Sequence, residues 1–71
     1  MKVRKGMVQV LGTTYRIARL MPELYEAVRI TDDMLVGLFH NGPTLEIIPG
    51  PIDAEIMAQI AQAAIQQAKA S

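Results

Sequence analysis

The sequence predicts a small α+β domain, in which an antiparallel sheet or partial barrel of four to five strands is followed by one C-terminal helix. Short runs of alternating apolar and polar residues, separated by turn-forming residues, occupy positions 7–48. Over positions 52–70 the period of the apolar residues changes to 3.6. The chain has 71 residues, which is enough for one domain only, residues 1–71.

The first two strands are expected at residues 7–11 and 15–20, because apolar and polar side chains alternate in both runs. Val8 and Val10 share one face of the first run. The segment Gly12-Thr13-Thr14 between the runs provides a tight connection. The two runs therefore predict a β-hairpin.

A third strand is expected at residues 25–30, where the alternation resumes after Pro22. A short helix that begins at Pro22 is the competing interpretation. Proline favours the first position of a helix, and Leu24 and Val28 lie four residues apart, as on one helix face. The sequence leaves residues 22–29 open between strand and helix.

The centre of the fold is expected at residues 34–39, which are apolar on both faces apart from Gly37. Asn41-Gly42 is a residue pair that readily accepts the positive φ angles of a type I′ turn, and it leads to a fifth strand at residues 45–48. The segment Pro49-Gly50-Pro51 cannot continue a hydrogen-bonded ladder, because proline has no amide hydrogen. The sheet should end there.

Residues 52–70 predict one amphipathic helix, with Ile56 and Ile60 toward the sheet and glutamines on the opposite face. Acidic residues in its first turn and Lys69 in its last turn suit the helix dipole. The apolar stripe is wider than one sheet face needs, which points to a second helix packed alongside from another subunit. The residues that widen the stripe are Met57, Ala61, Ile65 and Ala68.

A chain of this size cannot easily bury all of its apolar side chains. Size scaling gives a folded surface of about 4,400 Å² against about 11,300 Å² for the unfolded chain, so only about three fifths is buried on folding. Yet 51% of the residues are apolar and only 20% are charged. We therefore expect a homo-oligomer, and a dimer in particular, because two-fold pairs are the commonest closed assemblies. The expected interface residues are Met34, Val36, Leu38, Met57, Ile65 and Ala68.

The formal net charge is zero, but the charges are distributed unevenly along the chain. Residues 1–20 contain five bases and no acid, whereas residues 21–71 contain two bases and seven acids. This asymmetry fits a solvated strand face with head-to-tail complementarity between subunits, and it also fits a nucleic-acid partner. The residues that would contact nucleic acid are Lys2, Arg4, Lys5, Arg16 and Arg19.

The side chains needed for self-sufficient catalysis are missing. The chain has no cysteine and its one serine is the terminal Ser71, so no such nucleophile accompanies the single His40. His40 with Asp32 and Asp33 across a hairpin gives too few ligands to define a metal geometry. The glycines are scattered at turns and form no phosphate-binding loop. We expect no enzyme, no metal and no cofactor.

The N-terminal segment and the apolar runs bear on location. The chain begins with basic residues, but Gln9, Gly12 and Arg16 interrupt the apolar stretch that follows, so it makes a poor signal peptide. No apolar run approaches the length of a membrane span. We expect a cytoplasmic protein without a membrane partner.

Three segments together resemble the small barrel that ends many transposases and integrases. They are residues 5–17 with Gly12 and Tyr15, residues 28–33 with an acidic turn, and residues 36–42 with Phe39 and Gly42. In that family such segments build an SH3-like barrel, so the resemblance, which covers about half of the chain, implies an SH3-like fold. The family's DNA binding does not carry over to particular residues. The chain differs from the family in lacking the catalytic domain and in its long alanine-rich helix.

Taken together, these features predict a non-catalytic, homo-oligomeric interaction or binding module. The sequence does not identify a further protein partner. The alternative is a small nucleic-acid-binding accessory or regulatory protein that uses the basic N-terminal hairpin.

Overall fold

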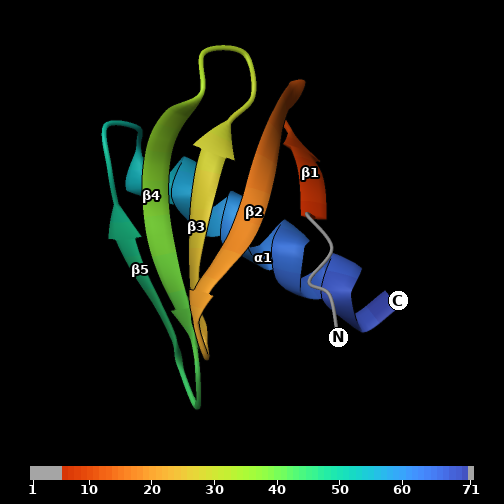
Figure 1. Cartoon of the computed structure of the whole chain (residues 1–71), viewed down its shortest axis with the longest axis vertical. Coiled ribbons are helices and arrows are strands. Elements are labelled where there is room, and N and C mark those ends of the chain that lie inside the picture. Colours follow the sequence, from red (N-terminus) through yellow and green to blue (C-terminus); the bar gives the residue numbers. More distant parts are fainter. Residues whose placement is uncertain (1–5, 71) are drawn as a thin grey trace.

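The computed structural model describes residues 6–70, which form five β-strands and one α-helix (Figure 1). The elements in chain order are β1 (Gly6–Val10), β2 (Thr13–Met21), β3 (Leu24–Arg29), β4 (Met34–Asn41), β5 (Leu45–Pro49) and α1 (Ala54–Ala70). Each strand pairs antiparallel with the next along the chain, so the order in the open sheet is β1-β2-β3-β4-β5. The predicted α+β class, an antiparallel sheet followed by one helix, is confirmed.

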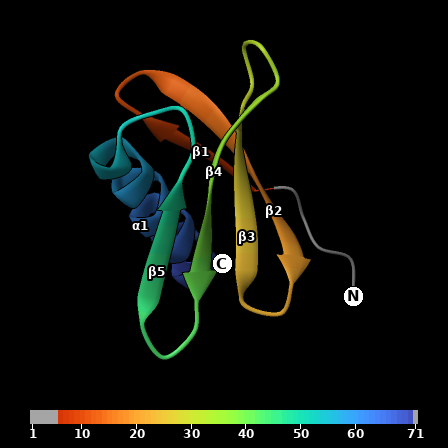
Figure 2. The same ribbon diagram turned by 90° about the vertical axis from the view of Figure 1, so that its left-hand side faces the viewer.

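The helix α1 covers one face of the sheet, which we call the inner face, and packs mainly against β1 and β5 (Figures 1 and 2). Alternation along the strands places one set of side chains under the helix. Phe39 lies at the centre of this core and stacks on Tyr25, with 5.2 Å between the ring centroids. The buried core residues are Val8, Val10, Tyr15, Ile17, Ala27, Val36, Phe39, Met57, Ile60 and Ala61.

The β1–β2 hairpin is closed by Leu11 and Gly12, one residue earlier than the predicted connection. The φ angles of these residues are 52° and 82°, and Val10 pairs directly with Thr13. Two successive positive φ angles are what a two-residue type I′ turn requires. Glycine adopts this conformation at no cost, whereas leucine adopts it against the steric preference of an L-residue.

Residues 24–29 form a strand, which decides between the two interpretations of this segment. Pro22 and Glu23 make a two-residue turn between the paired residues Met21 and Leu24. Glu23 has a φ of 73°, as the second central residue of a type II turn requires, and proline favours the first central position. The proline that suggested the start of a helix therefore belongs to a turn.

The predicted type I′ turn at Asn41-Gly42 is wrong. Asn41 pairs with Leu45, so three residues, Gly42, Pro43 and Thr44, connect β4 to β5. Among residues 6–70, Gly12 is the only glycine with a positive φ. A turn at Asn41-Gly42 would place Pro43 where a backbone N–H must donate across the hairpin, and proline has none to donate.

The predicted helix over residues 52–70 is confirmed, although it begins two residues later, at Ala54. Asp53 caps it: the backbone N–H of Glu55 donates to Asp53 Oδ1 at 2.7 Å, and the N–H of Met57 donates to the Asp53 carbonyl at 3.0 Å. A side-chain oxygen at this position satisfies an N–H that has no partner within the helix.

Candidate interaction face

The sheet face opposite α1, which we call the outer face, is not covered by any other element within residues 6–70 (Figure 2). Cross-strand pairing aligns its side chains in two rows. One row crosses from β1 to β4 and contains Met7, Arg16, Val28 and Leu35. The other crosses from β2 to β5 and contains Ala18, Glu26, Leu38 and Ile48.

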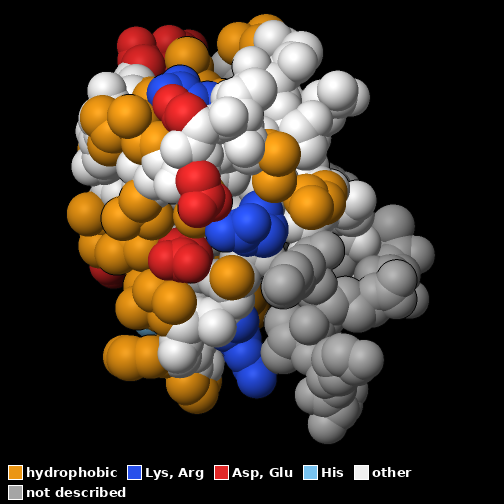
Figure 3. Space-filling view, turned by 45° about the horizontal axis from the view of Figure 1, so that its top comes forward, with side chains coloured by type: hydrophobic (Ala, Val, Ile, Leu, Met, Phe, Trp, Pro, Cys, Tyr) orange, Lys and Arg blue, Asp and Glu red, His pale blue; other side chains and the backbone are white. Residues whose placement is uncertain are grey.

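Large apolar side chains on the outer face are exposed, with the exception of Val28, which is buried. Ile48 exposes 55% of its surface, Leu35 48% and Met7 47%, and Leu38 beside Ile48 is half-buried. In Figure 3, hydrophobic side chains gather along the left side of the view, and charged side chains lie at its middle and toward its upper and lower ends. Monomeric soluble proteins rarely expose large contiguous apolar patches.

Two opposite charges lie within the two rows. Arg16 Nη2 lies 3.4 Å from Asp33 Oδ1, and Asp33 is in the loop between β3 and β4. The side chain of Glu26 forms no hydrogen bond or ion pair within residues 6–70. Arg16 pairs across the strands with Val28, and Glu26 pairs with Ala18, so the two charged residues are diagonal neighbours on adjacent strands.

A β-bulge in β4 decides which of its residues face outward. Ala27 pairs with Gly37, but its neighbour Val28 pairs with Leu35, so Val36 is an extra residue in β4. The bulge turns Val36 into the core, where it is fully buried, and places Leu35 on the outer face. Simple alternation had put Val36 outside.

The structure corrects the predicted oligomer interface at two of its six residues. Val36 and Met57 are fully buried within one chain, so neither side chain is available to a second copy. Met34 pairs with Arg29 at the rim of the inner face, away from Leu38. Ile65 is partly buried against the core and Ala68 lies in the last turns of α1. Of the six predicted residues, Leu38 alone is on the outer face.

The outer face also contains residues that the sequence analysis missed. Leu35 and Ile48 are its most exposed large apolar side chains on β4 and β5, and Glu26 lies next to Leu38. The sequence did contain a signal that could have placed Leu35 on this face. An isolated glycine inside a strand, here Gly37, often marks a bulge, and a bulge changes which residues of the strand face outward. Nothing in the local sequence distinguished Ile48 from a core residue.

The basic residues predicted to contact nucleic acid do not form one patch in the described part of the chain. Arg16 and Arg19 are three residues apart in β2, before the irregularity in that strand, and therefore point to opposite faces of the sheet. Asp33 also pairs with Arg16. The other three predicted residues, Lys2, Arg4 and Lys5, lie outside the described residues.

His40 is not close to the acids proposed as its partners. It lies near the end of β4 that leads to β5, whereas Asp32 and Asp33 lie in the loop before β4. Its Nε2 is instead 3.4 Å from Oε1 of Glu23 in the β2–β3 turn. Within residues 6–70 there is no group of three or more His, Cys, Asp or Glu side chains placed to hold a metal ion.

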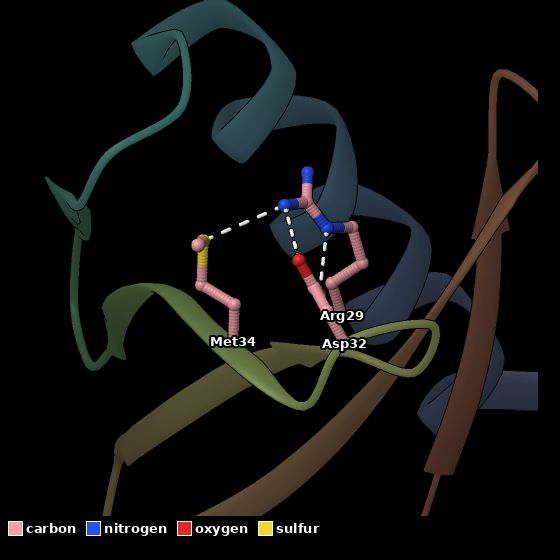
Figure 4. Close-up of polar contacts among 3 residues, drawn as sticks. All are labelled: Arg29, Asp32 and Met34. Carbon is pink, nitrogen blue, oxygen red and sulfur yellow. Dashed lines mark hydrogen bonds and ion pairs between the residues drawn. The ribbon is translucent and has the colours of Figure 1, made fainter.

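An open depression lies between the β1–β2 turn and the loop before β4. Arg29 donates from Nε and Nη2 to the two carboxylate oxygens of Asp32, at 3.0 and 2.8 Å, and Nη2 also contacts Met34 Sδ at 3.5 Å (Figure 4). The hydrogen bonding between Arg29 and Asp32, aided by the attraction of their opposite charges, raises the pKa of Arg29 and lowers the pKa of Asp32. The two charges neutralise each other, so the pair offers a ligand no unbalanced charge. The lining residues are Gly12, Thr13, Thr14, Arg29, Ile30, Thr31 and Asp32.

Comparison with known proteins adds no relative. No protein-family model, curated protein or solved structure matches the chain. Among residues 6–70, no helix combines the length and hydropathy needed to cross a membrane.

Proposed function

We propose that this protein is a non-catalytic interaction module that pairs with a second copy of itself through the outer face. The observation that carries the proposal is the set of exposed apolar side chains, Leu35, Leu38 and Ile48 with Met7, on a sheet face that no other described element covers. Burying such side chains stabilises an assembly by roughly 25 cal/mol per Å² of apolar surface.

The size of the outer face suits a dimer. A stable interface of standard size buries about 800 Å² on each partner, which is about a sixth of the chain's 4767 Å² surface. The sheet spans the two longer dimensions of a molecule that measures 28 × 22 × 19 Å (Figure 1). A dimer of standard size would therefore use the whole of this face.

The charges on the outer face favour a second copy over a partner of one charge sign. Arg16 and Glu26 lie on the same face, so a surface identical to this one offers each of them an opposite charge. A nucleic acid would match Arg16 but would meet Glu26 with like charge. It would also leave the apolar side chains beside them without contacts.

Replacement of Ile48 by Asp tests the proposal. Ile48 is 55% exposed in the single chain, so the change costs little folding stability, but it places a carboxylate in the proposed interface. Light scattering should give the wild type twice the 7.8 kDa mass of the chain and the Ile48→Asp variant the mass of one chain. Circular dichroism checks that the variant remains folded.

Leu11→Asp is the matched control. Leu11 is 76% exposed and lies in the β1–β2 turn, beyond the paired strands, and aspartate tolerates its positive φ. This variant should keep the mass of the wild type. A wild type with the mass of one chain would overturn the proposal, as would an Ile48→Asp variant that stays dimeric.

A further inference from the structure

Four outer-face residues on two adjacent strands form a quadrilateral with opposite charges at two of its corners. Arg16 of β2 faces Val28 of β3, and Ala18 of β2 faces Glu26 of β3. The charged residues occupy one diagonal, and the small apolar residues Ala18 and Val28 occupy the other. Leu35 extends the row beyond Val28.

The two charged residues are incompletely satisfied within the chain. The side chain of Glu26 is half-buried, with Ala18 on one side and Leu38 on the other, and it has no polar partner within residues 6–70. Arg16 has a single contact of 3.4 Å to Asp33, whose side chain is 78% exposed. A contact of this length to an exposed carboxylate is weak, so most of the guanidinium's donors remain free for a second partner.

This geometry points to a reciprocal ion pair in the dimer, in which Arg16 of each copy contacts the partner's Glu26. We propose this pairing on the basis of the dimer proposed above. A two-fold axis that lies along the Ala18–Val28 diagonal exchanges the positions of Arg16 and Glu26, so both ion pairs form at once. Val28 lies on this axis but is buried within its own chain, and Leu35 lies to one side of the axis. In a two-fold interface every contact occurs twice, so one choice of axis satisfies all the charges on the two rows.

The reciprocal pair would determine how the two sheets are aligned. Apolar contact between two sheet faces is not directional, and several relative rotations would bury similar areas. Only the alignment that joins opposite charges avoids leaving a carboxylate and a guanidinium desolvated without partners. Arg16 and Glu26 are therefore specificity-determining residues of the proposed interface.

Charge reversal at each position, and a mixture of the two variants, tests the pairing. Arg16→Glu and Glu26→Arg each create two like-charge contacts per homodimer, so each should raise the dissociation constant of the homodimer at least tenfold. In an equimolar mixture, one chain carries two acids and the other two bases at these positions. The mixture should form a heterodimer with a dissociation constant within a few-fold of the wild-type value.

Arg19→Glu is the matched control, because it makes the same change in the same strand on the opposite face and should leave the dissociation constant unchanged. Circular dichroism verifies the folding of every variant. If a reversal prevents folding, the neutral variants Arg16→Gln and Glu26→Gln replace it. Each of these should raise the dissociation constant several-fold, and an unchanged value would overturn the pairing.

The outcomes separate this inference from the proposal on which it rests. A wild type with the mass of one chain would overturn both. If the wild type is a dimer that Ile48→Asp disrupts, but the single reversals leave the dissociation constant within twofold, the outer face is the interface and the ion pair is wrong. A mixture that stays as monomeric as its components would also overturn the ion pair.

Discussion

Leu11 adopts a backbone conformation that suits few side chains, and it gains little from burial in return. Its φ is 52° and 76% of its surface is exposed. The left-handed region costs an ordinary L-residue roughly 1–2 kcal/mol, and asparagine avoids much of this cost. We predict that Leu11→Asn raises the free energy of unfolding by about 1 kcal/mol, measured by urea denaturation at a fixed protein concentration.

Leu20→Asn is the control for this prediction. Leu20 is 49% exposed in β2, and its φ is not positive. It therefore tests the removal of an exposed apolar side chain without relief of backbone strain, and it should not stabilise the protein. Equal effects of the two substitutions would show that the conformation of Leu11 carries no strain.

The orientation of single residues was the hardest feature to predict from the sequence. Alternation correctly placed Val8 and Val10 on one face, which is the face toward the core. It failed in β4, because one extra residue at the bulge exchanges the faces of Leu35 and Val36. A bulge depends on pairing with the neighbouring strand, and this pairing is not encoded in local alternation.

At the scale of elements, the sequence predicted all five strands and the helix, with small errors at their ends. Strong local signals explain this success: alternation in the strands, proline at the end of β5 and a 3.6-residue period in α1. The ambiguous segment 22–29 was decided by non-local contacts, since β3 pairs with both β2 and β4. A strand between two partners satisfies its backbone groups on both edges, which a lone short helix there would not.

The helix meets β4 at Gly37, where there is no room for a side chain. A Cβ atom at this position would lie 2.8 Å from Met57 Sδ and 3.0 Å from the carbonyl oxygen of Ile48. The methionine can shift, but the backbone carbonyl belongs to the paired strand β5. We predict that Gly37→Ala lowers the free energy of unfolding by about 1–3 kcal/mol, measured by thermal or urea denaturation.

Gly6→Ala provides the matched comparison. A Cβ atom at Gly6 would lie 3.9 Å from Ile17 Cβ, which is an ordinary packing distance, and its φ is not positive. This substitution should change stability by much less. If both variants unfold at the wild-type midpoint, the close approach of α1 to β4 at Gly37 is wrong.

At the scale of the whole molecule, the apolar composition motivated the prediction of a dimer. It did not show where on the molecule the unburied apolar surface lies. The predicted excess of apolar surface on the helix is reduced, because β1 and β5 flank α1 and fully bury Met57 and Ala61 within one chain. The exposed apolar side chains lie instead on the outer face of the sheet, at Leu35 and Ile48. The burial of the helix stripe depends on contacts with β5 and with β1, which is distant in the sequence, so no local sequence pattern encodes it.

The most direct test of the proposed self-association is sedimentation equilibrium of the wild-type protein over a range of micromolar concentrations. The account predicts a mass of twice 7.8 kDa at the upper end, which falls toward 7.8 kDa on dilution as a reversible dimer dissociates. The outer face would then be covered in the protein's working form. A mass of 7.8 kDa at every concentration would contradict the account, because the exposed apolar face would have no second copy to cover it.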